Sequence, residues 1–268
     1  MNFKKIRKEL KLNGVALIPN LIKYDSLYLV RNAIQFAMDY PSPFGRAIKN
    51  GNSVFFHDFW TYKRNKSVGK ILGLDDFRDT LSKVILDINE LRFFHDHILY
   101  KSPGADATPW HHDRPYYLVD GPDNFSIWIT PDSVEEDHSL AFICGSHLLP
   151  NEYIPVSFEN SKIMGTFEGL LELKDSDISL LAQRGIIIYK MSPGDAVIFN
   201  NKTLHRSLAS SASTIRTALS LRFVTKNSWL TKKFVNAAPP FHKMGMTYRE
   251  GDKCIEKWFP EYASFGVK

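Results

Sequence analysis

The stretch "TPWHHDRPYY" (108–117) places two histidines and an aspartate next to one another. In an extended segment residues i and i+2 share a face, so His111 and Asp113 can point together while His112 points away. A histidine and a carboxylate can both ligate a divalent metal ion, but two such close neighbours cover only one edge of it. The pattern therefore predicts part of a metal site, with a third ligand supplied from elsewhere in the chain.

The best candidate for the third ligand is His205 in "NNKTLHRS", just beyond the apolar run "DAVIFN" (195–200). A histidine that follows a buried strand can reach the end of a neighbouring strand in a closed sheet. Two histidines and one carboxylate leave positions on the metal open for substrate chemistry. We therefore expect a catalytic rather than a purely structural metal.

Arg216 lies eleven residues after His205, on one face with Ala218, Ser220 and Arg222. Small neighbours leave room beside its guanidinium, whose planar fork suits a carboxylate. A divalent ion bound to one aspartate has a positive net charge. A dicarboxylate that also binds makes the net charge of the site negative, and the positive charge of one arginine makes it neutral. The sequence thus indicates that an organic diacid shares the site with the metal. Arg222 is the alternative carboxylate partner, and the interval from His205 favours Arg216.

Short β-rich runs surround these residues and must position them. Gly, Pro, Asp and Ser separate the runs, a pattern typical of all-β folds rather than of alternating βαβ units. The runs are 93–101, 124–130, 140–145, 185–190, 195–200 and 214–224. A mainly β fold with flanking helices, a jelly roll, fits this pattern best.

Helices are expected before the β-rich part. Residues 3–12, 25–40 and 75–91 carry helix formers or apolar residues at helical spacing, and "VALIPNL" (15–21) indicates a short strand between the first two. The stretch 151–184 is expected to be an insertion over the sheet. We expect one domain, comprising a helical N-terminal part (1–92), a jelly-roll core (about 93–225) and a C-terminal cover (226–268).

Composition limits the class of protein. The chain has 268 residues, is 44% hydrophobic and carries a net charge of +5, but its lysines and arginines are scattered, which argues against a nucleic-acid partner. No run reaches the roughly 18 apolar residues of a membrane span, and no secretory signal is evident. Its two cysteines lack metal-like spacing. We expect a cytoplasmic protein that acts on a small molecule, with some preference for an anionic one; its oligomeric state is not predicted.

The sequence resembles the phytanoyl-CoA dioxygenase family of non-haem Fe(II)- and 2-oxoglutarate-dependent oxygenases. The matching segments follow the family's order and spacing over roughly 93–225. They are "KSPGADATPWHHD" (101–113), "IWIT" (127–130), "FICGSHL" (142–148) and "MSPGDAVIFNNKTLHRSLASSASTIRTALSLRF" (191–223). The resemblance implies a double-stranded β-helix, the same jelly roll that the strand pattern indicates.

The resemblance also implies roles for particular residues. His111, Asp113 and His205 correspond to the catalytic iron ligands. Residues that correspond to 2-oxoglutarate contacts are Arg216, which binds the far carboxylate, Ser207, which supports it, Trp128 beside the co-substrate, and His97. The implied reaction uses O2 and 2-oxoglutarate, releases succinate and CO2, and hydroxylates an unactivated C–H bond. Related halogenases have a small residue where Asp113 stands, so hydroxylation is expected rather than halogenation.

Other polar and aromatic residues are candidates for the substrate pocket. They are His57 in "FFHDFWTY" (55–62), Arg114 and Tyr116. His112 is expected at the cavity rim or in solvent. His95 and His97 also share a face, but without a downstream partner set they are not expected to bind a metal.

Two other functional classes compete with the oxygenase. A catalytically silent jelly roll that binds a ligand is one, but such a protein has no reason to keep both a metal group and a diacid clamp. A zinc-dependent hydrolase that uses the same triad is the other, and it would not need Arg216.

Overall fold

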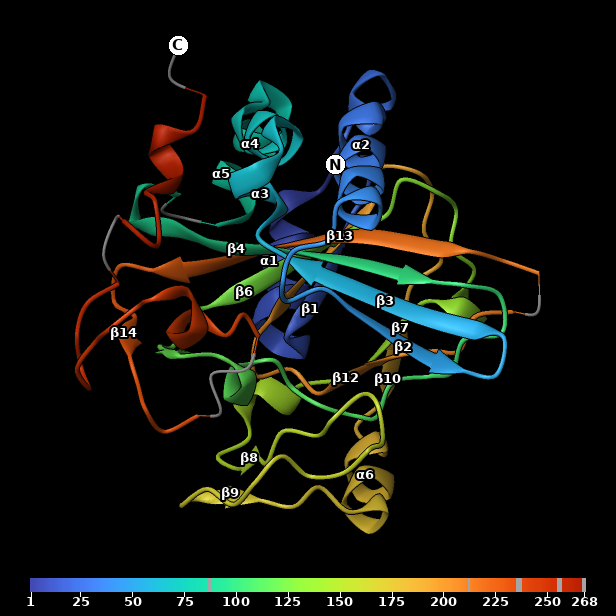
Figure 1. The fold of residues 1–268 in the computed structure, drawn as a ribbon, viewed down its shortest axis with the longest axis vertical. Helices are drawn as coiled ribbons and strands as arrows, with labels where there is room; N and C mark the ends of the chain where they lie inside the picture. The colour runs from blue at the N-terminus through green and yellow to red at the C-terminus, as the bar shows by residue number, and fades with distance from the viewer. Residues whose placement is uncertain (86–87, 212, 235–237, 255–256, 267–268) are drawn as a thin grey trace.

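The computed structural model describes residues 1–85, 88–211, 213–234, 238–254 and 257–266. Within these ranges a large sheet forms the centre of the fold, and Figure 1 shows helices above it and a smaller sheet below. All neighbouring strands of both sheets are antiparallel. The large sheet has seven strands in the order β1 (Val15–Ile18), β11 (Ala196–Asn200), β6 (Phe125–Ile129), β13 (Arg216–Thr225), β4 (Leu91–Lys101), β3 (Ser53–Phe59) and β2 (Arg46–Asn50).

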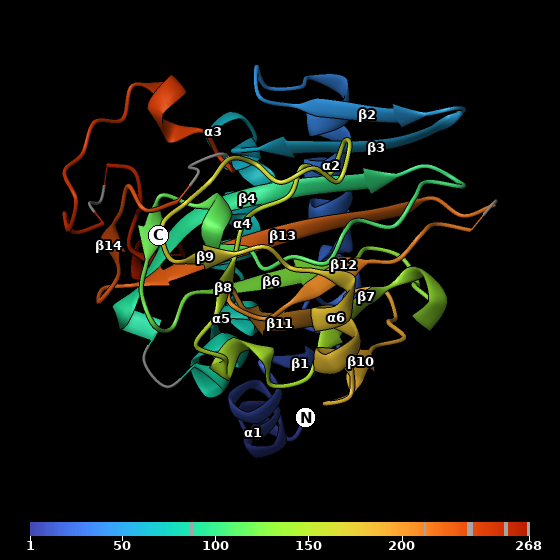
Figure 2. The ribbon, with the colours of Figure 1, turned by 90° about the horizontal axis from the view of Figure 1, so that it is seen from below.

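The smaller sheet packs against the half of the large sheet that β1, β11, β6 and β13 form (Figure 2). Its strands are β10 (Ile186–Ile188), β7 (Leu140–Ile143) and β12 (His205–Ser207). Apolar side chains fill the space between the two sheets, among them Trp128, Phe142 and Phe199. Two mainly antiparallel sheets packed in this way form a jelly roll, which confirms the expected fold class.

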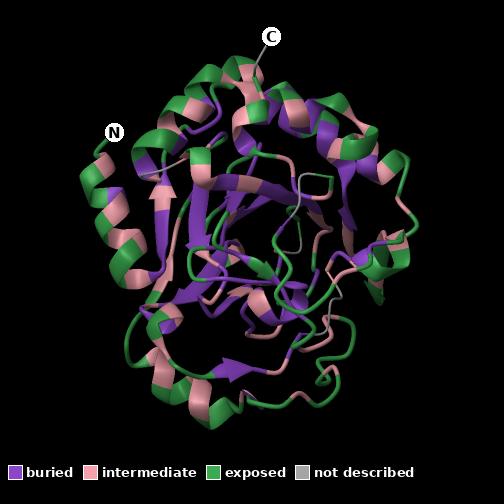
Figure 3. Ribbon diagram, turned by 90° about the vertical axis from the view of Figure 1, so that its left-hand side faces the viewer, coloured by how far each residue is buried: buried purple, intermediate pink, exposed green. Residues whose placement is uncertain are grey.

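Side-chain alternation along β13 separates the core from the site. Leu219, Leu221 and Phe223 point toward the helices and belong to the largest apolar cluster, whereas Ser220 and Arg222 line a cavity on the opposite face. The helices that cover the apolar face are α2 (Leu27–Asp39), α3 (Thr61–Arg64), α4 (Lys66–Gly73) and α5 (Asp75–Val84), and α1 (Phe3–Asn13) flanks the edge strand β1 (Figure 1 and Figure 2). Their outward faces are exposed, while the strands beneath them are buried (Figure 3).

The N-terminal part differs from expectation because it is not only helical. It contributes three strands to the large sheet: β1, where the sequence predicts a short strand over 15–21, and β2 and β3, which were not predicted. β2 escapes sequence analysis because it is an edge strand that is mostly exposed on both faces and therefore lacks apolar alternation. α5 ends at Val84, earlier than the helix expected over 75–91, of which residues 86–87 lie outside the described residues. β12, only three residues long, is also not evident from sequence.

The stretch 151–184 lies on the side of the smaller sheet away from the helices, and Figure 2 shows it crossing in front of the strands. It contains β8 (Glu152–Tyr153), β9 (Leu170–Leu171) and α6 (Asp175–Ala182). The described tail adds β14 (Trp229–Leu230), which pairs with β5 (Val119–Asp120), and packs Phe241 and Phe259 against Phe94. Among the described residues, no helix combines the length and apolarity that a membrane crossing requires. That the chain is one domain stays a prediction.

Candidate active site

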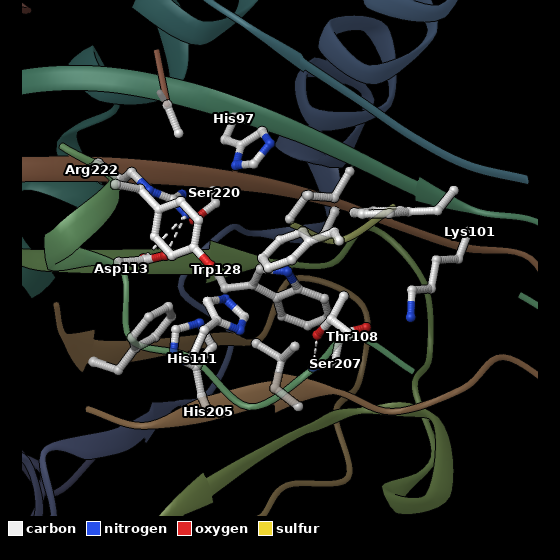
Figure 4. Close-up of a pocket in the computed structure, with 18 of the residues that line it drawn as sticks. His97, Lys101, Thr108, His111, Asp113, Trp128, His205, Ser207, Ser220 and Arg222 are labelled. Carbon is white, nitrogen blue, oxygen red and sulfur yellow. Dashed lines mark hydrogen bonds and ion pairs between the residues drawn. The ribbon is translucent and has the colours of Figure 1, made fainter. Parts of the chain in front are cut away.

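Two histidines from distant parts of the chain face one another across a backbone bridge. The His111 N–H donates to the His205 carbonyl at 2.9 Å, and the His205 N–H donates to the His111 carbonyl at 2.8 Å. Asp113 follows two residues later, so its side chain lies on the same side as that of His111. One ligand atom from each of the three residues lies within 4.8 Å of the others, and all three residues are buried (Figure 4).

The hydrogen bonds of the two imidazoles select one nitrogen of each for a metal. The Nδ1 atoms of His111 and His205 lie 2.9 Å from the carbonyls of Pro109 and Thr203 respectively. A carbonyl only accepts, so Nδ1 carries the proton and Nε2 keeps a free lone pair. Burial and repulsion from His205 lower the pKa of His111 to about 3, and burial lowers the pKa of His205. Both rings are therefore neutral near pH 7, the form that binds metal.

Asp113 is held in its ionised form by a buried cation. Burial acts to raise its pKa, but Arg222 and the two histidines outweigh this and keep the pKa below the ordinary value. The Arg222 Nη2 lies 3.2 Å from Oδ2 of Asp113, and the Ser126 hydroxyl donates to the same oxygen at 3.1 Å. Oδ1 accepts a longer bond from the same Nη2, at 3.4 Å, and is therefore the less occupied oxygen and the better placed one for a metal.

Arg216 lies in the same cavity as this group, in the direction of Ser207. Its Nη2 donates to the Ser207 hydroxyl, and its Nη1 donates to the carbonyl of His138. The Trp128 ring lies 6.0 Å from the Arg216 guanidinium carbon. Among the described residues no carboxylate pairs with this buried arginine, so an anion that entered the cavity would find a free positive charge.

Two cavities meet at this site. The inner one, of about 90 Å³, is lined by the three candidate metal ligands together with Trp128, Ser207 and Arg216. The outer one, of about 310 Å³, is lined by β2, β3 and the 156–164 part of the insertion. Four residues line both cavities and therefore mark where the two adjoin, a place called the passage below: His97, Tyr116, Phe158 and Ala238.

The residues present fit the cofactors of an iron oxygenase. Two neutral imidazoles and one ionised carboxylate form a donor set that suits Fe(II). Arg216 supplies an uncompensated cation for the far carboxylate of a diacid in the same cavity. A site that held only a hydrolytic metal would not need this second feature.

A model of the phytanoyl-CoA dioxygenase family matches residues 47–218, which is most of the chain and includes all three metal-ligand candidates and Arg216. The chain belongs to this family. Its members depend on Fe(II), 2-oxoglutarate and O2, so these are the cofactors and co-substrates of the family to which the chain belongs. The matched range contains the strands that position the site, among them β4, β6 and β12.

A curated relative supports the family assignment over part of the chain. "Dioxygenase lolE1" from Epichloe uncinata is 31% identical over 114 residues, which are 42% of this chain. The chain spans 38% of the length of that relative in this match. The similarity therefore concerns a segment and does not extend to the whole of the relative.

Solved structures share the fold along almost the whole chain. The non-haem α-ketoglutarate-dependent epimerase SnoN from nogalamycin biosynthesis has a TM-score of 0.76 at 14% identity, covering 97% of this chain and 95% of its own. The carbocyclase SnoK from the same biosynthesis reaches 0.73 at 15% identity, covering 96% and 95%. EctD from S. alaskensis reaches 0.66 at 16% identity, covering 86% and 79%. At these identities the likeness establishes the jelly roll alone.

Two expectations from the sequence are wrong. Arg114 lines neither cavity, because it turns away to form ion pairs with Asp120 and with Glu152, the latter at 2.8 Å. His112 is buried rather than at a rim, and its Nε2 accepts the Tyr153 N–H at 2.9 Å. Arg114 and His112 instead connect the segment that carries the candidate metal ligands to the 151–184 insertion.

The remaining candidates lie at or near the passage. His97 lines both cavities and its Nε2 lies 3.3 Å from Nδ1 of His57, which lines the outer cavity. The Tyr116 hydroxyl donates to the Val156 carbonyl at 2.7 Å and accepts from the Val156 N–H at 2.8 Å. The ring centroid of Phe158 lies 4.6 Å from that of His111. Phe158 was not predicted as a site residue, because it falls in an insertion without strand or helix periodicity.

Proposed function

We propose that this chain is an Fe(II)- and 2-oxoglutarate-dependent oxygenase that hydroxylates an unactivated C–H bond of a small molecule. The observation that carries the proposal is the presence of His111, Asp113, His205 and the unpaired Arg216 around one buried cavity. The reaction consumes the substrate, O2 and 2-oxoglutarate and yields the hydroxylated substrate, succinate and CO2. Family membership supports the reaction class.

In this proposal His111, Asp113 and His205 hold the iron, which when bound supplies oxidation by O2 coupled to decarboxylation of 2-oxoglutarate. The two Nδ1–H groups bonded to main-chain carbonyls keep the Nε2 atoms directed at the metal. Ser126 and Arg222 orient the Asp113 carboxylate. Arg216 with Ser207 binds the far carboxylate of 2-oxoglutarate, and the Trp128 ring excludes water beside it.

The outer cavity receives the substrate. It shares His97 and Phe158 with the inner cavity but is lined by neither Arg216 nor Ser207, so a small molecule held there need not displace a co-substrate bound at Arg216. Phe55, Phe158 and the neutral His57 give this route an apolar, aromatic lining; burial lowers the pKa of His57 to about 4. A bound substrate would close the passage and keep bulk water from the metal.

The test is anaerobic titration of 2-oxoglutarate into the Fe(II)-loaded protein, followed by its weak metal-to-ligand charge-transfer absorption. The band should appear in the wild type, and Arg216→Ala should require much more 2-oxoglutarate to produce it. Iron binding without any band at saturating 2-oxoglutarate would favour a hydrolase. Failure to bind either iron or 2-oxoglutarate would favour a ligand-binding protein.

A further inference from the structure

Lys101 is a buried lysine at the inner cavity to which the proposed reaction assigns no task. Its side chain is 1% exposed, and it lines the same cavity as Arg216 and Ser207. Figure 4 shows it beyond Thr108 and Ser207, on the side away from Asp113. Its Nζ donates to the main-chain carbonyls of Asp106 and, at 3.1 Å, Leu208. No carboxylate forms an ion pair with it among the described residues.

Strand register places Lys101 directly opposite Arg216. The two residues are Cα partners at the ends of β4 and β13, so their side chains lie on the same face of the sheet. The Arg216 Nη1 also reaches the Leu208 carbonyl, at 3.4 Å, so that both cations converge on one acceptor. Two like charges directly opposite one another on adjacent strands repel, and more so when they are buried, so the Lys101 amine keeps its proton at neutral pH only when an anion lies beside it. Such an arrangement calls for an anion between or beside them.

We propose that Lys101 is a second binding residue for 2-oxoglutarate and that its ammonium contacts the far carboxylate together with the Arg216 guanidinium. This inference rests on the proposed function, because it requires the diacid to occupy the inner cavity. The far carboxylate then binds two groups of different shape. The planar guanidinium binds it through its forked N–H donors, and the ammonium attracts it as a point charge. The competing interpretation is that Lys101 only ties the 102–106 loop to Leu208.

Proton linkage follows from this placement. Burial, followed by repulsion from Arg216, lowers the pKa of Lys101 to about 6, while Asp106 acts in the opposite direction. Arg216 on β13 and Asp106 in the adjoining loop are the charged groups that face it, and β3 contributes only the Phe55 ring, at 5.6 Å. An arriving carboxylate raises the pKa of Lys101, so binding takes up a proton. The affinity for 2-oxoglutarate should therefore decrease as the pH rises from 6 to 9.

The experiment is anaerobic calorimetry on the Fe(II)-loaded protein with two ligands, 2-oxoglutarate and 2-oxopentanoate, which lacks the far carboxylate. Lys101→Gln retains a donor for the main-chain carbonyls but removes the charge. It should raise the Kd of 2-oxoglutarate about tenfold, the loss of one charge-assisted hydrogen bond. The Kd of 2-oxopentanoate should change less than about twofold. Lys202→Gln is the matched control, since Lys202 also donates to a main-chain carbonyl, that of Leu149, but lines neither cavity.

Wild-type protein gives a second readout that needs no variant. Titrations in two buffers of different ionisation enthalpy should reveal proton uptake with 2-oxoglutarate near pH 7.5 and none with 2-oxopentanoate. Equal weakening of both ligands by Lys101→Gln, or unchanged binding of 2-oxoglutarate, would overturn the inference and leave the proposed function standing. Wild-type protein that binds no 2-oxoglutarate would overturn both.

Discussion

Arg222 and Asp113 form a buried ion pair immediately behind the candidate metal group, with 3.2 Å between Nη2 and Oδ2. The same guanidinium donates to the Tyr117 hydroxyl and, at 2.6 Å, to the Ser220 hydroxyl. Arg222 is therefore committed to orienting a metal ligand, and Arg216 is left for the diacid. Two arginines six residues apart on one strand face thus have separate tasks.

Arg222→Met should weaken Fe(II) binding, although Arg222 is not one of the three candidate metal ligands. The Asp113 carboxylate would lose its buried partner, its pKa would rise, and protons would compete with the metal for it. Loss of a residue that holds a metal ligand in place typically lowers metal affinity tenfold to a hundredfold, and we expect about that. Anaerobic competition with a chromogenic chelator measures it. An unchanged affinity, with the fold intact by circular dichroism, would contradict the orienting role.

Asp113→Ala and His205→Ala should abolish succinate formation, because each removes one of the three candidate metal ligands. His112→Asn is the matched control, since His112 adjoins both ligands in sequence but its Nε2 bonds to the backbone of Tyr153 in the insertion. Succinate release and bound iron are the quantities to measure. Full activity in either ligand variant would remove that residue from the metal site.

The metal-free protein should lose stability as the pH falls below about 6.5. His95 is fully buried, and burial, then Arg222, hold its pKa well below the ordinary value. The unfolded chain therefore binds a proton that the folded chain does not, and the free energy of unfolding falls by up to about 1.4 kcal/mol per pH unit for each such group. In His95→Phe, the loss between pH 7.5 and 5.5 should be about 1 kcal/mol smaller in urea denaturation.

A matched substitution checks the origin of that difference. Phe93 is a fully buried residue near His95 that carries no ionisable group, and Phe93→Leu should leave the pH dependence of unfolding as it is in the wild type. If His95→Phe and the wild type lose the same stability over this range, the buried imidazole is not the source.

Tyr116→Phe should loosen the insertion over the site. Its hydroxyl makes two hydrogen bonds to Val156, which together hold the 156–164 segment at the passage. Losing them should cost about 1 kcal/mol or somewhat more of local stability. Faster amide hydrogen exchange at Val156 and Met164, with unchanged iron affinity, is the expected result. Tyr24→Phe, at an exposed hydroxyl, is the control, and equal exchange in both variants would contradict the anchoring role.

Several features of the site follow from local pattern. The i, i+2 spacing of His111 and Asp113, the alternation along 215–223 and the sequence of short apolar runs identify two metal ligands, the face of Arg216 and the β class of the fold. Each of these depends on one strand's own geometry. The side chains of a strand alternate regardless of the strands beside it, so these features can be predicted before the strand pairing is known.

Other features depend on which strands become neighbours. The large sheet pairs β13 with β4 and β6, and this register sets Lys101 against Arg216. The packed fold also directs Arg222 to Asp113, Arg114 to Asp120 and Glu152, and His112 to the backbone of the insertion. A charged side chain can take any of several partners along the chain. Desolvation makes that choice in the folded protein, because a buried charge must lie where an opposite charge or a ligand can compensate it.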